Sequence, residues 1–235
     1  MQNIKALIFD VFGTLVDWRT SIARNAESIL SAHAVAIDWL AFADAWRAQY
    51  QPAMDEVRNG RRPFCKLDVL HRRNLDVVLD QFDLKRIDEV TRQRLNLSWH
   101  RLDAWPDVAP GLQRLRGKFR IAPCSNGNIS LMVDLARLND FPWDAILGAE
   151  IARDYKPKPV VYLSAAEAFD CWPDETMMVA AHSSDLAAAA EVTLRTAFIA
   201  RPDEFGPGRG EPSASVAVDL SATSLMDLAT QLGCS

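Results

Sequence analysis

The sequence predicts an α/β fold in which an all-helical segment interrupts a parallel sheet. From about residue 105 onward, short apolar runs of β-forming residues alternate with stretches that carry apolar residues at helical spacing. That alternation is typical of βαβ units on a parallel sheet. Residues 18 to about 100 contain helical patterns and no convincing strand. The apolar run at residues 4–9 therefore joins the later sheet, because a lone strand has no partner among helices.

The 235 residues are enough for one large domain or two small ones. The change of pattern predicts an α/β core domain of residues 1–16 and 100–235, and a helical domain of residues 17–99 inserted after the first strand. Within the insertion, apolar residues at helical spacing predict helices over residues 21–32, 37–50, 67–79 and 88–97. Such an insertion would lie over the edge of the sheet where the first strand ends.

The second part of the core supplies the remaining strands and helices. Apolar runs predict strands at 119–123, 145–147, 177–180, 196–200 and 215–218, with helices at 129–138, 160–169 and 185–192 between them. Residues 202–213 are rich in Gly and Pro, which favours a surface loop. A last helix is expected at 225–232, with Ser221 or Thr223 as its N-cap.

The composition excludes several classes of protein. A hydrophobic share of 49% and a charged share of 24% are those of an ordinary globular protein. A net charge of −5 gives no electrostatic reason to expect a nucleic-acid partner. The four cysteines lack CxxC spacing, which argues against a disulfide framework or a zinc site. No signal pattern and no apolar run of about 20 residues is present, so we expect no membrane partner and a cytoplasmic location.

The most informative segment is residues 5–15, KALIFDVFGTL, in which a buried strand ends on Asp10 and a glycine turn follows. Ligands of open α/β sheets bind just outside the carboxyl ends of the strands, so Asp10 lies where chemistry is expected. An Asp at a strand end is equally common as a simple turn residue. Matches farther along the chain are needed to decide between these two interpretations.

Three later segments are further candidates, two at strand ends and one just before a helix. Residues 124–128, CSNGN, follow a predicted strand, where Ser125 and Asn126 either cap the next helix or form an anion-binding turn with backbone N–H groups. Residues 154–159, DYKPKP, precede a helix; Lys156 is either a surface charge or an ammonium that would keep Asp10 ionised. Residues 179–186, VAAHSSDL, end a strand and carry His182 and Asp185.

Together, and in this order, the four segments resemble the motifs of the haloacid dehalogenase (HAD) superfamily, and the whole chain resembles its type II (S)-2-haloacid dehalogenases. The resemblance implies a Rossmann-like, HAD-like core with a helical cap. It implies that Asp10 is the nucleophile, that Lys156 rather than Lys158 is the site lysine, and that Thr14 and Asp185 belong to the catalytic set. Asp185 would help to activate the hydrolytic water.

The same resemblance implies a set of substrate-binding residues. Arg47, which follows Trp46 on a predicted helix, would contact the substrate carboxylate and the departing halide, although Arg on an amphipathic helix is by default a surface residue. The other implied contacts are Ser125 and Asn126 for the carboxylate, Tyr162 for a hydrogen bond within the site, and Val11 and Phe12 for the apolar wall. His182 departs from the family pattern, and we expect it to have a polar role in the site.

Phe12 decides between the activities of the superfamily. Most members are Mg²⁺ phosphatases with a second Asp at this position, and a phenyl ring cannot ligate a hard cation. We therefore expect no metal and no cofactor. The resemblance then implies metal-independent hydrolysis of short 2-haloalkanoic acids through an aspartyl ester, releasing halide and a 2-hydroxy acid with inversion at C2. The alternatives are a HAD-type phosphatase and a non-catalytic small-anion-binding relative. A homodimer is possible, as in other family members.

Overall fold

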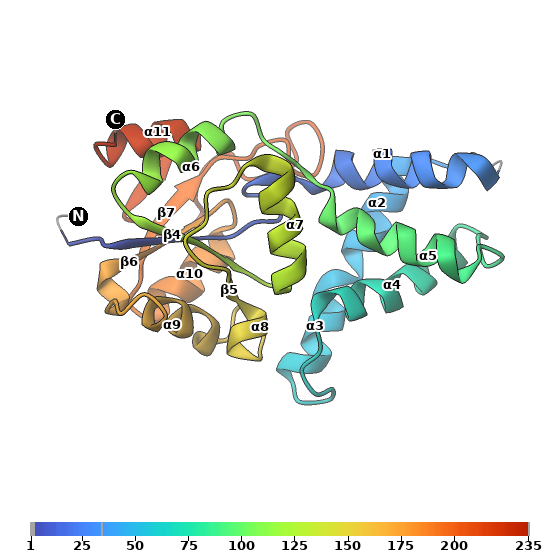
Figure 1. Ribbon diagram of the computed structural model, residues 1–235, viewed down its shortest axis with the longest axis horizontal. Coiled ribbons are helices and arrows are strands. Elements are labelled where there is room, and N and C mark those ends of the chain that lie inside the picture. The colour runs from blue at the N-terminus through green and yellow to red at the C-terminus, as the bar shows by residue number, and fades with distance from the viewer. Residues whose placement is uncertain (1–2, 34, 235) are drawn as a thin grey trace.

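The computed structural model describes residues 3–33 and 35–234 and contains a parallel sheet at one end and a group of helices at the other (Figure 1). Within the described residues, six strands form this sheet in the order β5-β4-β1-β6-β7-β8, and every neighbouring pair is parallel. The strands are β1 (Ala6–Phe9), β4 (Arg120–Ser125), β5 (Leu147–Gly148), β6 (Thr176–Ala180), β7 (Arg195–Ile199) and β8 (Leu220–Ala222). Strand β1 lies between β4 and β6, so the residues that follow these three strands meet at one edge.

Apolar side chains cover both faces of the sheet, as a parallel sheet requires. Alternate residues of β1 serve the two faces: Leu7 and Phe9 belong to one buried cluster, and Ala6 and Ile8 to the other. The first cluster includes residues of α6 (Val108–Arg116), α7 (Ile129–Asn139) and α11 (Leu225–Gln231). The second includes residues of α9 (Pro159–Glu167) and α10 (Ser183–Glu191); the short α8 (Ala149–Ala152) follows β5.

The helical region comprises α1 (Trp18–Leu30), α2 (Trp39–Ala48), α3 (Tyr50–Arg58), α4 (Leu67–Gln81) and α5 (Glu89–Asn96). These helices lie at the end of the molecule away from α9 and α11 (Figure 1). The chain leaves the core through β2 (Val16–Asp17) and returns through β3 (Asp103–Ala104), and these two strands pair antiparallel. Short 3₁₀ turns cover Ser31–His33, Leu97–His100 and Pro173–Glu175.

The predicted fold class is confirmed, and several element boundaries were wrong. The helix expected at 37–50 begins only at Trp39, because Asp38 caps it by accepting from the N–H groups of Leu40 and Ala41. It ends at Ala48, and α3 starts anew at Tyr50. Helix α6 was not predicted because it contains Pro110 and Gly111. Pro110 lies in the first turn, where no intrahelical N–H bond is lost.

The strand predicted at 215–218 is wrong, because the strand that pairs with β7 is Leu220–Ala222. Asp219 fixes this register: its carboxylate accepts from the Thr196 N–H at 2.9 Å, and its own N–H donates to the Thr196 carbonyl at 3.1 Å.

The last helix is capped by Ser224, whose hydroxyl accepts from the Asp227 N–H at 3.1 Å, and not by Ser221 or Thr223. No described helix has the length and apolar character needed to cross a membrane. The domain boundaries at 16/17 and 99/100 stay predictions.

Candidate active site

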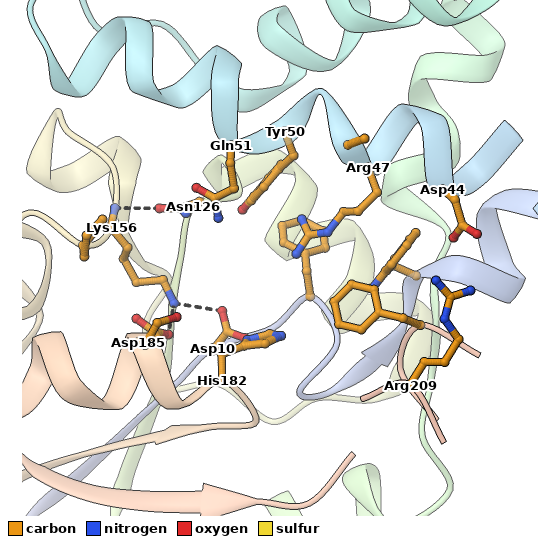
Figure 2. A pocket seen from close by; sticks show the side chains of 16 residues that line it. Asp10, Asp44, Arg47, Tyr50, Gln51, Asn126, Lys156, His182, Asp185 and Arg209 are labelled. Carbon is orange, nitrogen blue, oxygen red and sulfur yellow. Dashed lines mark hydrogen bonds and ion pairs between the residues drawn. The ribbon is translucent and has the colours of Figure 1, made fainter. Parts of the chain in front are cut away.

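A cavity of about 670 Å³ lies beside the carboxyl ends of β1 and β6, under residues of α2 and α3 (Figure 2). Its walls combine charged groups from the core with aromatic and charged groups from the helical region. The lining residues are Asp10, Phe12, Trp18, Asp44, Arg47, Ala48, Tyr50, Gln51, Asn126, Lys156, Pro157, His182, Ser184, Asp185, Phe205 and Arg209. A cavity of this kind, with convergent charges, is the first place to look for a binding site.

Asp10 follows β1 directly, and each of its carboxylate oxygens is held by hydrogen-bond donors. Oδ1 accepts from the Lys156 ammonium at 2.8 Å. Oδ2 accepts from the Thr14 hydroxyl at 2.7 Å and lies 3.1 Å from Nδ1 of His182. Burial alone would raise the pKa of Asp10, but the Lys156 and His182 charges hold this pKa well below its usual value. The carboxylate is therefore ionised and fixed in orientation.

Lys156 lies on the loop before α9, and its side chain is 7% exposed. Its backbone N–H donates to Asn126 Oδ1 at 2.8 Å, which ties this loop to the end of β4. The ammonium also donates to Asp185 Oδ2 at 2.5 Å, and so bridges two carboxylates (Figure 2). Burial disfavours the charged form, but Asp10 and Asp185 outweigh it and raise the pKa of Lys156. Lys156 is thus a permanent cation inside the site.

The structure places Asp185 in the first turn of α10. Its Oδ1 accepts from the Tyr162 hydroxyl at 2.5 Å while its Oδ2 accepts from Lys156. Burial, together with the charge of Asp185, raises the pKa of Tyr162, so Tyr162 stays a neutral donor. Tyr162 itself is fully buried and does not line the cavity. Tyr162 therefore fixes the orientation of Asp185 without contacting the cavity.

Thr14 connects the residues that follow β1 with those that follow β6. Its hydroxyl donates to Asp10 and accepts from the Ala181 N–H at 2.9 Å, next to His182. Gly13 precedes it with a φ of +87°, a conformation that an L side chain rarely adopts. A Cβ at Gly13 would also lie 2.1 Å from Oε1 of Glu204, so any other residue here would strain the backbone and displace the Glu204 carboxylate.

Arg47 reaches the cavity from α2 and stands over aromatic rings. Its guanidinium carbon lies 4.0 Å from the centre of the Tyr50 ring and 5.4 Å from that of Trp18. One terminal nitrogen, Nη1, is buried and has no hydrogen-bond partner among the described residues. A buried donor of this kind is costly unless an acceptor fills the site. The arrangement therefore favours a bound anion next to Arg47.

Phe12 lies at the base of the helical region. The centre of its ring is 5.9 Å from that of Trp99 and 6.2 Å from that of Tyr50, and both pairs are T-shaped. It lines the cavity and supplies an apolar wall. Val11 is buried but does not line the cavity. Within residues 3–33 and 35–234, no group of three or more His, Cys, Asp or Glu side chains is placed to hold a metal ion.

The structure separates Ser125 from Asn126. Asn126 lines the cavity, and because its Oδ1 accepts from Lys156, its amide nitrogen is the atom left to donate to a ligand. Ser125 is fully buried, its hydroxyl accepts from the Gly127 N–H at 3.0 Å, and it does not line the cavity. A direct contact of Ser125 with substrate stays a prediction.

Sequence reasoning missed Glu204, which is 2% exposed although it lies in the predicted surface loop 202–213. Its carboxylate accepts from Trp18 Nε1 at 3.0 Å and lies 2.9 Å from His182 Nε2. A Gly- and Pro-rich segment gives no local signal for burial, and the contacts that bury Glu204 span 186 residues to Trp18. The same limit applies to Arg58, which donates to the Lys156 carbonyl at 2.5 Å.

Comparison with known proteins gives a consistent result. The model of the haloacid dehalogenase-like hydrolase family matches residues 4–193. The crystal structure of a defluorinating L-2-haloacid dehalogenase is 45% identical and superimposes with a TM-score of 0.95, covering 97% of this chain and 95% of that one. A second L-2-haloacid dehalogenase structure, also 45% identical, gives a TM-score of 0.93 over 97% and 98% of the two chains. (S)-2-haloacid dehalogenase 4A of Burkholderia cepacia is 28% identical over 87% of this chain and 88% of its own length.

Proposed function

The chain belongs to the haloacid dehalogenase-like hydrolases, and from this we propose that it hydrolyses short (S)-2-haloalkanoic acids to 2-hydroxy acids through an ester on Asp10. The observation that carries this proposal is the pairing of two groups across one cavity. Asp10 is an ionised, immobilised carboxylate, and Arg47 is a cation whose buried Nη1 has no partner among the described side chains. A substrate with an anionic head and an electrophilic carbon fits between them.

In the first step, an oxygen of Asp10 attacks C2 of the haloacid, and the carbon–halogen electron pair leaves with the halide. Arg47 and the amide nitrogen of Asn126 bind the substrate carboxylate and hold C2 in line with Asp10. Positioning supplies much of the rate advantage of such a displacement. Phe12 and the Tyr50 ring exclude water from the reacting carbon.

In the second step, water attacks the ester carbonyl of Asp10 and releases the hydroxy acid, with the configuration at C2 inverted overall. Asp185, whose two oxygens are held by Lys156 and Tyr162, orients this water. One proton of the water goes to the leaving oxygen of the hydroxy acid. The other goes to solvent, because the regenerated Asp10 stays ionised.

Halide release from a panel of 2-haloacids tests the proposed function. We expect release from (S)-2-chloropropionate, little from its (R)-enantiomer, and formation of (R)-lactate. Fluoroacetate belongs in the panel because one relative that is 45% identical is a defluorinating enzyme. The absence of halide release from every 2-haloacid, with a folded protein, would overturn the proposal in favour of the small-anion-binding alternative.

Assembly and location are proposals of a different kind. We propose a homodimer on the resemblance to other members of the family, and a cytoplasmic location because the four cysteines are unpaired, as is usual in a reducing compartment. Light scattering on the purified protein tests the first, and fractionation of cells that express it tests the second. A monomer at micromolar concentration would contradict the dimer.

A further inference from the structure

The side of Asp10 opposite Lys156 carries a second, separate charge arrangement. His182 lies between two carboxylates, with Nδ1 3.1 Å from Asp10 Oδ2 and Nε2 2.9 Å from Glu204 Oε2. Only the doubly protonated imidazolium donates to both at once. Burial opposes this charge, but the hydrogen bonds to Asp10 and Glu204 raise the pKa of His182 to about 10. The ring is therefore a cation near neutral pH.

Glu204 is built into the site and is not a chance neighbour of His182. Its second oxygen is held by Trp18 Nε1, the first residue of α1. Gly13 leaves the space that its carboxylate fills. Its loop is anchored by Arg201, which donates to the Thr14 carbonyl at 2.8 Å and pairs with Asp107 at 2.9 Å. The loop thus delivers a fixed anion to the far side of His182.

The two oxygens of Asp10 differ in their surroundings, and this difference suggests their roles. Oδ1 has one donor, the Lys156 ammonium, whereas Oδ2 has two, the Thr14 hydroxyl and His182. The oxygen with fewer donors has more free lone-pair density for attack on carbon. If Oδ1 forms the ester bond, Oδ2 becomes the carbonyl oxygen, and it already faces two donors.

We propose that Glu204 is a positioning residue that keeps His182 protonated and aimed at Asp10 Oδ2, so that His182 and Thr14 stabilise the oxyanion formed when water attacks the ester. This inference rests on the proposed function and concerns its second step. As the water oxygen bonds to the ester carbonyl carbon, the C=O electron pair moves onto Oδ2. The intermediate then collapses, the bond from that carbon to Oδ1 breaks, Oδ1 leaves as the protonated hydroxyl of the hydroxy acid, and the water oxygen restores the carboxylate.

The two steps should respond differently to the imidazolium. A cation next to Asp10 stabilises its carboxylate and so gives no help to the displacement. The same cation next to the ester meets a growing negative charge, which is where preorganised donors are most effective. Loss of the charge on His182 should therefore slow ester hydrolysis and leave halide release from the first turnover intact.

Glu204→Gln separates charge from geometry. The amide oxygen of the new side chain can still accept from Trp18, and its N–H can donate to Nε2 of a neutral His182, which keeps Nδ1–H on Asp10. Glu204→Asp keeps the negative charge with a shorter reach. Asp203→Asn is the matched control, because it makes the same carboxylate-to-amide change at an exposed neighbour on the same loop.

The test is rapid-quench measurement of halide from (S)-2-chloropropionate, with intact-protein and peptide mass spectrometry of Asp10. We expect Glu204→Gln to release about one halide per site at the wild-type rate, then turn over at least 10-fold more slowly with esterified Asp10 accumulating. Glu204→Asp should recover part of the steady-state rate, and Asp203→Asn should match wild type. Wild-type turnover by Glu204→Gln, or equal slowing of both steps without ester, would overturn the inference. A wild-type protein that releases no halide would instead refute the proposed function.

Discussion

The ammonium of Lys156 lies 2.8 Å from Asp10 Oδ1 and 2.5 Å from Asp185 Oδ2, so one buried cation holds both carboxylates of the site. Asp10 and Asp185 come from different strand ends, and Lys156 comes from a third segment of the chain. Without the cation, two buried carboxylates would face each other, and one of them would take up a proton. The nucleophile therefore depends on this residue for its charge.

Lys156→Met tests this dependence. We expect the pKa of Asp10 to rise and the acid limb of kcat/KM to move to higher pH, because burial then acts on Asp10 with less compensation. Breaking a buried ion pair on one side also destabilises proteins by roughly 3–5 kcal/mol. A pH–rate profile and a chemical denaturation curve measure the two effects. Lys158→Met, two residues away, is the matched control, and an equal loss there would contradict the assignment.

Arg47→Ala should lose about one to two decades in kcat/KM, because a hydrogen bond to a charged group contributes roughly 1.5–3 kcal/mol. Steady-state kinetics with (S)-2-chloropropionate measure this loss. Arg61→Ala is the control, since Arg61 is exposed. Arg58 is not a neutral control, because it donates to the Lys156 carbonyl. Equal and small effects at Arg47 and Arg61 would show that the substrate anion lies elsewhere.

Metal removal should leave dehalogenation unchanged. The phenyl ring of Phe12, which lines the cavity, cannot ligate a metal ion. The Lys156 ammonium binds Asp10 and Asp185, the two carboxylates that line the cavity next to it. Dialysis against EDTA followed by assays with and without added Mg²⁺ measures the effect on halide release. A generic phosphate ester, tested in parallel, should be hydrolysed only at background rate. Strong Mg²⁺-dependent phosphate release would favour the phosphatase alternative.

His71→Phe should make folding stability less sensitive to acid. Burial lowers the pKa of His71 to about 3, and both ring nitrogens lack partners among the described residues. The unfolded chain takes up this proton near pH 6.5, but the folded chain does so only near pH 3, so stability falls as pH drops through this window. At pH 5, which is 1.5 pH units below 6.5, the free energy of unfolding is lower by about 2 kcal/mol, because each pH unit contributes about 1.4 kcal/mol.

Denaturation curves of wild type and His71→Phe at pH 8 and pH 5 measure this difference. Phe keeps the aromatic contact with Trp99, whose ring centre is 4.2 Å from that of His71. His100, whose pKa is raised by Asp68 and Asp134 against the effect of burial, is present in both proteins and cancels in the comparison. An identical decrease in the free energy of unfolding between pH 8 and pH 5 would show that His71 takes up its proton in the folded state.

Local patterns in the sequence predicted the fold class and the residues that follow β1, β4 and β6, because a buried strand and the turn after it are encoded within a few residues. Asp10 and Asn126 were found in this way, whereas Lys156 and Asp185 were singled out by the resemblance to the family's motifs; all four line the cavity. Glu204 was not found, because its burial depends on Trp18 and His182 and not on its neighbours in sequence. The strand predicted at 215–218 was misplaced for the same reason, since Asp219 sets its register through Thr196.

A single-turnover experiment in ¹⁸O-labelled water tests the covalent role of Asp10 most directly. With enzyme in excess over (S)-2-chloropropionate, an oxygen of Asp10 enters the product, and water then refills the carboxylate at the carbonyl carbon. The account predicts that the first lactate formed carries ordinary oxygen and that the label appears in the peptide that contains Asp10. Labelled lactate from the first turnover, with an unlabelled Asp10, would mean that water attacks C2 directly and would contradict the ester mechanism.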